Sequence, residues 1–117
     1  MNSLLSREVD DANNFWNWGG LYIGYRSVDC LFGRDGHQIG YFAEGDEVYG
    51  CAGNYIGEVR SGNRLITNLS KKAWTRKSVA ARSFKTSPGH RDTSSKEMLT
   101  GFEDFAAPSE RNSLVNA

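Results

Sequence analysis

The chain has 117 residues, enough for a single domain, and its 14 basic and 14 acidic residues balance, so no overall charge favours nucleic acid or a membrane surface. Two cysteines are too few for a disulfide framework, and no apolar run approaches the ~18 residues of a membrane-spanning helix. The charge is uneven, however: residues 1–66 hold nine acids and five bases, and residues 67–117 hold five acids and nine bases. This asymmetry indicates either an interaction tail or a solvated, poorly ordered C-terminal end.

Residues 1–14 are predicted to form an N-terminal arm. They lack the basic start and the apolar stretch of a secretory signal, so we expect a cytoplasmic location. In such a compartment Cys30 and Cys51 would pair only if the fold brought them close. Two thiols without histidines at a suitable spacing are also a weak metal site.

Residues 15–70 contain a repeat. Residues 31–40 align with residues 48–57 after a shift of 17, and with residues 15–24 after a shift of 16. Each copy has an apolar pair, a glycine-containing turn and an Ile-Gly step, and a fourth copy begins at Leu65 before it loses the pattern. Three copies in one register predict repeated structural units that share one core. The isoleucines of the step are Ile23, Ile39 and Ile56.

Each unit is predicted to be two short strands joined by two turns. The Asp35-Gly36 pair tolerates positive φ, which a type I′ hairpin requires, and return turns are expected at Gly45 and Gly62. The spacing leaves no room for crossover helices, so the sequence predicts an all-β, antiparallel meander of about seven strands. Glycine is unusual inside a strand, and its place after each isoleucine indicates a bend or a close backbone approach.

Several segments together resemble a known family. Residues 15–24, 56–59 and 63–68, with Gly101-Phe102-Glu103-Asp104-Phe105 near the end, resemble the bacterial 4-fold beta flower proteins. The resemblance implies repeated β-hairpins in a pseudo-fourfold arrangement, like four petals around an axis. It implies no particular activity. Beyond the petals we expect a disordered or loosely ordered C-terminal tail, because few large apolar residues lie there.

The candidate ligand or partner contacts in the repeat are three aromatic residues and one histidine, namely Trp16, Trp18, Tyr22 and His37. Aromatic side chains at alternating strand positions either pack the core and the unit interfaces, which we favour, or line a groove for a ligand or peptide. A catalytic histidine needs a nucleophile or carboxylate held beside it. Asp35 is expected to point into its turn, so we favour a surface turn role for His37.

The acidic residues 44–47 offer oxygen ligands for a divalent cation. They lack the alternating spacing of a calcium-binding loop, so a solvated hairpin tip is the favoured interpretation. No nucleophile elbow, phosphate-binding loop or dinucleotide motif is present. We therefore assign no catalytic residue, no metal ligand and no cofactor.

Residues 71–100 are predicted to be a basic, low-complexity linker. A basic run with one tryptophan can contact phosphates while the indole stacks on a base. A flexible basic linker is the favoured alternative. The candidate nucleic-acid contacts are Lys71, Lys72, Trp74, Arg76 and Lys77.

Residues 101–117 are predicted to be a tail that carries the aromatic and acidic motif. The motif could dock on the β-domain of the same chain or of a neighbour, with its acidic pair meeting a basic edge. Chance composition is the alternative. The candidate docking residues are Phe102, Glu103, Asp104 and Phe105.

The leading functional hypothesis is a small, non-enzymatic interaction or binding module that uses its hairpin tips or axial face for an unidentified protein or peptide partner. A second hypothesis is nucleic-acid binding through residues 71–91, and a third is an enzyme with a site at the axis. The unpaired edges of a small sheet also favour a homo-oligomer. No membrane partner is expected.

Overall fold

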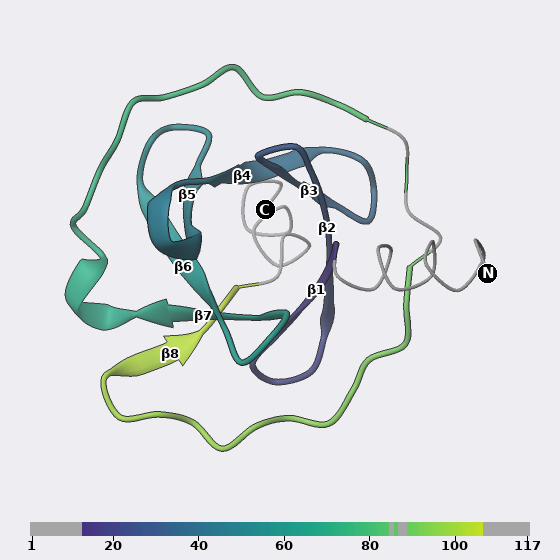
Figure 1. Ribbon diagram of the computed structural model, residues 1–117, viewed down its shortest axis with the longest axis vertical. Coiled ribbons are helices and arrows are strands. Elements are labelled where there is room, and N and C mark those ends of the chain that lie inside the picture. Colours follow the sequence, from purple (N-terminus) through teal and green to yellow (C-terminus); the bar gives the residue numbers. More distant parts are fainter. Residues whose placement is uncertain (1–12, 85, 87–88, 107–117) are drawn as a thin grey trace, which may run out of the picture.

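The computed structural model describes residues 13–84, 86 and 89–106, and nearly all of its regular structure is β (Figure 1). The strands are β1 (Asn14–Asn17), β2 (Tyr22–Ser27), β3 (Cys30–Gly33), β4 (Gln38–Phe42), β5 (Glu47–Gly50), β6 (Tyr55–Arg60), β7 (Arg64–Asn68) and β8 (Phe102–Asp104). Two short 3-10 turns are η1 (Glu44–Asp46) and η2 (Leu69–Lys71). No helix in the described residues is long and apolar enough to cross a membrane.

The first seven strands form a closed barrel. Each strand pairs antiparallel with the next, as the meander prediction required, and β1 also pairs with β7. This closing pair is parallel, with Trp16 opposite Arg64, because an odd number of up-and-down strands brings the first and last together in the same direction. Closure pairs the two outer edges of the meander with each other. The expectation of a homo-oligomer was based on these edges being unpaired.

The Ile-Gly step is a β-bulge in every repeat. Val48 lies opposite Gly57 and Tyr49 opposite Tyr55, so Ile56 is the extra residue, and equivalent register shifts occur in the two earlier repeats. Such a bulge bends the strand and increases its twist, which helps a small sheet to close. A Cβ at Gly40 would overlap the carbonyl oxygen of Tyr49. The predicted close backbone approach is therefore confirmed.

The tip turns differ from the prediction. At the second tip Gly36 N donates to Gly33 O (3.0 Å) and Gly33 N donates to His37 O (2.9 Å). Gly36 has a positive φ of 88°, whereas Asp35 does not lie in the left-handed region. The type I′ prediction was thus wrong, because only the glycine of the pair is left-handed. The Asp35 carboxylate instead accepts a hydrogen bond from His37 N (3.0 Å).

The interior of the barrel is filled with apolar side chains. Two of the repeat isoleucines belong to this core, and Ile39 packs against it, as the repeat predicted. The core residues are Phe15, Ile23, Leu31, Phe42, Val48, Ile56, Leu65 and Phe105. An enzyme site at the axis, the third hypothesis, would have to occupy space that these side chains fill.

A fourth petal completes the pseudo-fourfold arrangement. Strand β8 pairs antiparallel with β7, and Ile66 lies opposite Asp104 just as Tyr49 lies opposite Tyr55 in the third repeat. Phe105, which follows Asp104, therefore takes the position of the repeat isoleucine and is buried in the core. The fourth hairpin is complete, but its loop runs from residue 69 to residue 101.

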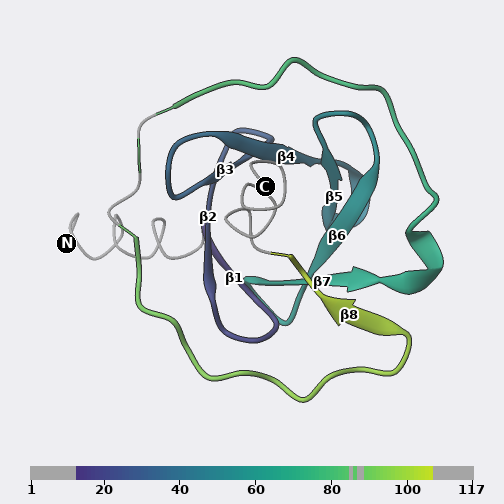
Figure 2. The ribbon, with the colours of Figure 1, turned by 180° about the vertical axis from the view of Figure 1, so that it is seen from behind.

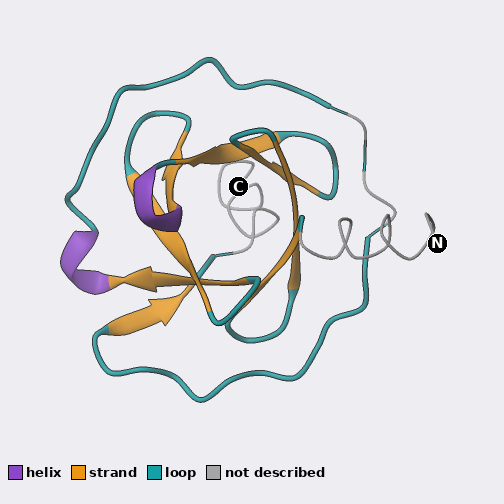
Figure 3. Ribbon diagram, in the orientation of Figure 1, coloured by secondary structure: helices purple, strands orange, loops and turns teal. Residues whose placement is uncertain are grey.

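That loop encircles the other three petals. The segment 72–100 is here called the belt, and its described residues, 72–84, 86 and 89–100, lie around the barrel between η2 and β8 (Figures 1 and 2). The belt contains no helix or strand in its described residues (Figure 3). One of its bonds recurs at each of the three tips: Arg76 N donates to Gly53 O (2.7 Å), Phe84 N to Gly36 O (2.8 Å) and Thr93 N to Gly20 O (2.7 Å).

Candidate partner-binding groove

Three of the predicted ligand or partner contacts, Trp16, Trp18 and Tyr22, lie beneath the belt. Trp16 Nε1 donates to Arg91 O (2.8 Å), and Trp18 Nε1 donates to Glu97 O (2.9 Å). Tyr22 is buried, and its backbone N donates to the Asp92 carboxylate (3.0 Å). These side chains therefore hold the belt, and none of them belongs to the central apolar cluster of the barrel.

Each of the first three petals also receives one ring from the belt. Trp74 packs on Tyr55 with ring centroids 6.5 Å apart, and Phe84 packs on Phe32 at 5.5 Å. His90 packs on Tyr22 at 5.0 Å. Aromatic pairs at such distances contribute about 0.5–1.5 kcal/mol beyond the area they bury. The aromatic surface of the barrel is thus occupied mainly by the chain's own belt.

His37 lies at the exposed tip of the second petal, with 76% of its side chain accessible. Its Nδ1 is 3.3 Å from the Asp35 carboxylate. Burial alone would raise the pKa of Asp35, but the hydrogen bonds and charge of His37 outweigh it and lower that pKa. The pair is exposed on a turn, outside the barrel interior, so it lacks the enclosed surroundings of an active site.

Lys71, at the start of the basic segment, is largely buried between two carboxylates. Its Nζ lies 2.9 Å from a carboxylate oxygen of Glu47 and 2.9 Å from one of Glu58. Tyr49 and Tyr55 donate their hydroxyls to the same two carboxylates. Burial alone would raise the pKa of Glu47, but the bonds from Lys71 and Tyr49 lower it. The cluster anchors the chain where it enters the belt.

The other candidate nucleic-acid contacts spread along the belt. Lys72 pairs with Glu103 (2.8 Å), and the Arg76 guanidinium carbon lies 5.4 Å from the Tyr49 ring centroid. Trp74 is about half exposed. Lys77 is exposed, and its carbonyl accepts the hydroxyl of Tyr41 (2.7 Å). Lys72 is thus paired with a carboxylate, and Arg76 lies against a tyrosine ring.

The aromatic and acidic motif is placed on the barrel as β8. The Asp104 carboxylate accepts the backbone N–H groups of Trp18 (2.8 Å) and Gly19 (2.9 Å), which joins the fourth petal to the first tip. The carbonyl of Phe105 accepts Asn17 Nδ2 (3.2 Å). Phe102 lies under the guanidinium of Arg60 at 4.8 Å.

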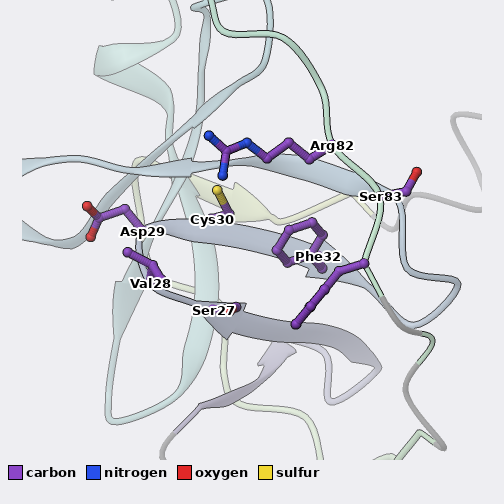
Figure 4. A pocket seen from close by; sticks show the side chains of 8 residues that line it. Ser27, Val28, Asp29, Cys30, Phe32, Arg82 and Ser83 are labelled. Atoms are coloured by element: carbon purple, nitrogen blue, oxygen red, sulfur yellow. The ribbon is translucent and has the colours of Figure 1, made fainter.

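A groove opens between the turn that joins β2 to β3 and the belt (Figure 4). Its volume is about 430 Å³, within the usual range of ligand pockets. Cys30 and Phe32 lie on its floor, and Figure 4 shows the Arg82 side chain reaching across above Cys30. The lining residues are Ser27, Val28, Asp29, Cys30, Phe32, Arg82, Ser83 and Phe84.

Two apolar side chains that line the groove are exposed to solvent. Phe84 is 50% accessible, and Val28 is 85% accessible. Val28 also has a φ of 56°, a left-handed conformation that is strained for a β-branched residue. The Arg82 guanidinium has no side-chain or backbone partner in the described part of the chain. By contrast, every deeply buried side-chain polar atom there is hydrogen-bonded.

Other polar groups give no second site within the described residues. No group of three or more His, Cys, Asp or Glu residues is placed to hold a metal ion there. In the acidic segment 44–47 only Glu47 has a salt bridge, to Lys71. Cys30 and Cys51 are both free thiols, and burial raises the pKa of the Cys51 thiol.

A family model described as "4-fold beta flower protein" matches residues 13–111. The chain belongs to this family. The match extends across the belt as well as the petals, so the beta flower unit includes the encircling segment. A search of the curated proteins and a search of the solved structures each found no match.

Sequence reasoning about this beta flower chain did not single out the groove. Arg82 and Phe84 lie in the basic segment 71–100, where no repeat or motif distinguishes them. One signal was available: Val28 occupies the tip of a tight turn, where glycine, asparagine or aspartate is usual. The groove itself depends on where the belt passes, which the sequence did not reveal.

Proposed function

We propose that this beta flower protein is a non-enzymatic binding module that engages another protein through the groove between the β2–β3 turn and the belt. The observation that carries the proposal is the exposure of Val28 and Phe84 beside Arg82, whose guanidinium has no partner among the described residues. Exposed apolar side chains next to a cation are typical of protein-binding surfaces. The barrel and the belt serve as the rigid support.

Val28 supports the proposal in a second way. A strained left-handed valine with an exposed side chain destabilises the fold, and such strain is characteristic of functional positions. Asparagine tolerates this backbone conformation far better. Val28→Asn should therefore stabilise the protein by about 1 kcal/mol while it weakens partner binding. A thermal unfolding curve for this variant measures the first effect.

The binding test uses a phage-displayed library of random short peptides, panned on the full chain. Recovered peptides are then measured by fluorescence anisotropy against the wild type, Phe84→Ser and Leu69→Ser. Leu69 is a matched control, since it is an exposed apolar residue on η2, outside the groove. We expect Phe84→Ser to lose about tenfold or more in affinity and Leu69→Ser to bind as the wild type. Failure to recover a peptide, or equal binding by Phe84→Ser, would refute the function.

Nucleic-acid binding through residues 71–91 is the weaker candidate. Lys71 and Lys72 already have carboxylate partners, and the remaining cations follow the belt around the barrel. A duplex that contacts one face meets only some of them, so the phosphate contribution would be small. Filter binding of a labelled oligonucleotide at low ionic strength tests it, with Arg76→Glu as the variant. Steeply salt-dependent binding that this variant abolishes would favour nucleic acid over the groove proposal.

A cytoplasmic location is part of the proposal. The two half-buried thiols, Cys30 and Cys51, are both unpaired, which suits a reducing compartment. Fractionation of cells that express the tagged chain would test this expectation.

A further inference from the structure

We infer that the occupant of the groove is an extended acidic segment of a partner protein, with an apolar side chain placed between Val28 and Phe84. This inference rests on the proposed function and adds the chemistry of the partner. Three independent features of the groove lead to it: its charge, its apolar walls and the unused backbone of the belt.

The charge of the groove favours a carboxylate. Asp29, the acid in the lining, is already paired with Arg26 at 3.2 Å. Arg82 is therefore the lining charge that keeps no partner in the described part of the chain, and its guanidinium offers a planar set of donors that fits a carboxylate. An acidic partner gains an ion pair there, whereas a basic partner meets an uncompensated cation.

The apolar walls favour a side chain beside that carboxylate. Phe32 is buried on the floor under Phe84, with ring centroids 5.5 Å apart, so the position of Phe84 is fixed although half of the ring is accessible. Val28 faces solvent from the opposite wall. A leucine- or phenylalanine-sized group would cover both exposed surfaces, which is how an anchor residue gains affinity.

The backbone of the belt favours an extended partner. Ser83 forms an isolated antiparallel bridge with His37, and the bonds of this bridge come from the residues on either side of Ser83. Phe84 N donates to Gly36 O (2.8 Å), and Arg82 O accepts from Gln38 N (3.0 Å). In this pattern the N–H and C=O of Ser83 point away from the barrel. Within the described residues they have no hydrogen-bond partner, so an extended segment can pair with them.

The test repeats the peptide selection in parallel on the wild type, Arg82→Glu and Lys96→Glu. Lys96→Glu makes the same charge change elsewhere on the belt, at an exposed side chain outside the groove. We expect the wild type and Lys96→Glu to select peptides that carry acids beside a large apolar residue. Arg82→Glu should select basic peptides and lose about tenfold in affinity for the acidic ones.

A second readout tests the backbone pairing. In the complex with a selected acidic peptide, amide exchange at Ser83 N–H should slow by about tenfold or more relative to the free protein. Unchanged exchange at Ser83 would overturn the extended pairing.

The outcomes separate this inference from the proposed function. If Phe84→Ser abolishes binding but the selected peptides show no preference for acids, the binding module stands and the acidic partner is wrong. Equal effects of Arg82→Glu and Lys96→Glu would likewise overturn it, because they would show only general attraction. Self-association of the wild type that Phe84→Ser removes would assign the groove to a second copy and also contradict the inference.

Discussion

The barrel and the belt are both ordered, but different interactions hold them in place. The barrel is held by side chains that recur in the sequence, with an isoleucine bulge and a glycine in each repeat. The belt has no such recurrence, yet it meets each tip through one backbone bond to an equivalent glycine carbonyl. A repeated surface can thus order a segment that is not itself a repeat, since backbone N–H groups are available at almost any residue.

The greatest loss of stability is expected at Phe105, the core residue of the barrel that follows the belt in the chain. Phe105→Ala should destabilise the protein by about 4 kcal/mol, because it empties a fully buried position. Phe84→Ala, in the belt, removes a ring that is half exposed and should cost about 1 kcal/mol. Chemical denaturation measures both. Equal losses would show that the fourth petal is no more integral than the belt.

The next largest loss of stability is expected at Gly40, a strand glycine of the repeat. Gly40→Val should cost about 3 kcal/mol, because the new side chain would overlap the carbonyl of Tyr49 in the neighbouring strand. Gly62→Ala is the matched control: it has a positive φ of 84° but nothing within 4 Å of the new Cβ, so backbone strain of about 1 kcal/mol is its only cost. A Gly40→Val variant as stable as Gly62→Ala would argue against the close strand approach.

A smaller effect is expected where β8 joins the first tip. Asp104→Asn weakens the bonds that the carboxylate accepts from Trp18 N and Gly19 N, and should cost about 1–2 kcal/mol. Glu103→Gln breaks only the exposed pair with Lys72 and should cost at most about 0.5 kcal/mol. Thermal unfolding of the two variants compares them, and the reverse order would contradict the placement of β8.

The smallest effect is the pH dependence of the anchor at the start of the belt. Glu47 has a lowered pKa in the folded protein, so it stabilises the fold above its ordinary pKa of 4.5, and this contribution is lost as the pH falls through the folded value. The free energy of unfolding of wild type and Glu47→Gln should therefore differ near neutral pH and converge once the pH falls below the lowered pKa of Glu47. A difference that persists unchanged in acid would show that the Lys71 bridge is not its source.

The sequence predicted the barrel well and the belt hardly at all. The isoleucine bulges and their glycines leave a periodic mark because each repeat needs the same local geometry. The turn type predicted for Asp35-Gly36 was wrong. The same two residues suit more than one type of turn, and the pairing of the flanking strands decides which type forms. No sequence pattern predicts the belt, because the residues that bond the tips, Arg76, Phe84 and Thr93, have only their backbone N–H in common.

The candidate site shows the same division. His37 and the basic run stood out by residue type, but the structure places His37 on an exposed turn and pairs Lys71 and Lys72 with carboxylates of the same chain. Val28, Arg82 and Phe84 form the groove only because the belt passes beside the β2–β3 turn. Such a juxtaposition of segments far apart in the chain is a tertiary property, and residue type alone does not encode it.

Residue-specific amide exchange can show whether the petals order the belt. The N–H groups of Arg76, Phe84 and Thr93 should exchange about tenfold or more slowly than those of Thr75, Ser83 and Asp92, since only the first three donate to a tip glycine. Protection that recurs at these three positions supports a belt ordered by the petals. Uniformly fast exchange across residues 72–100 would contradict it.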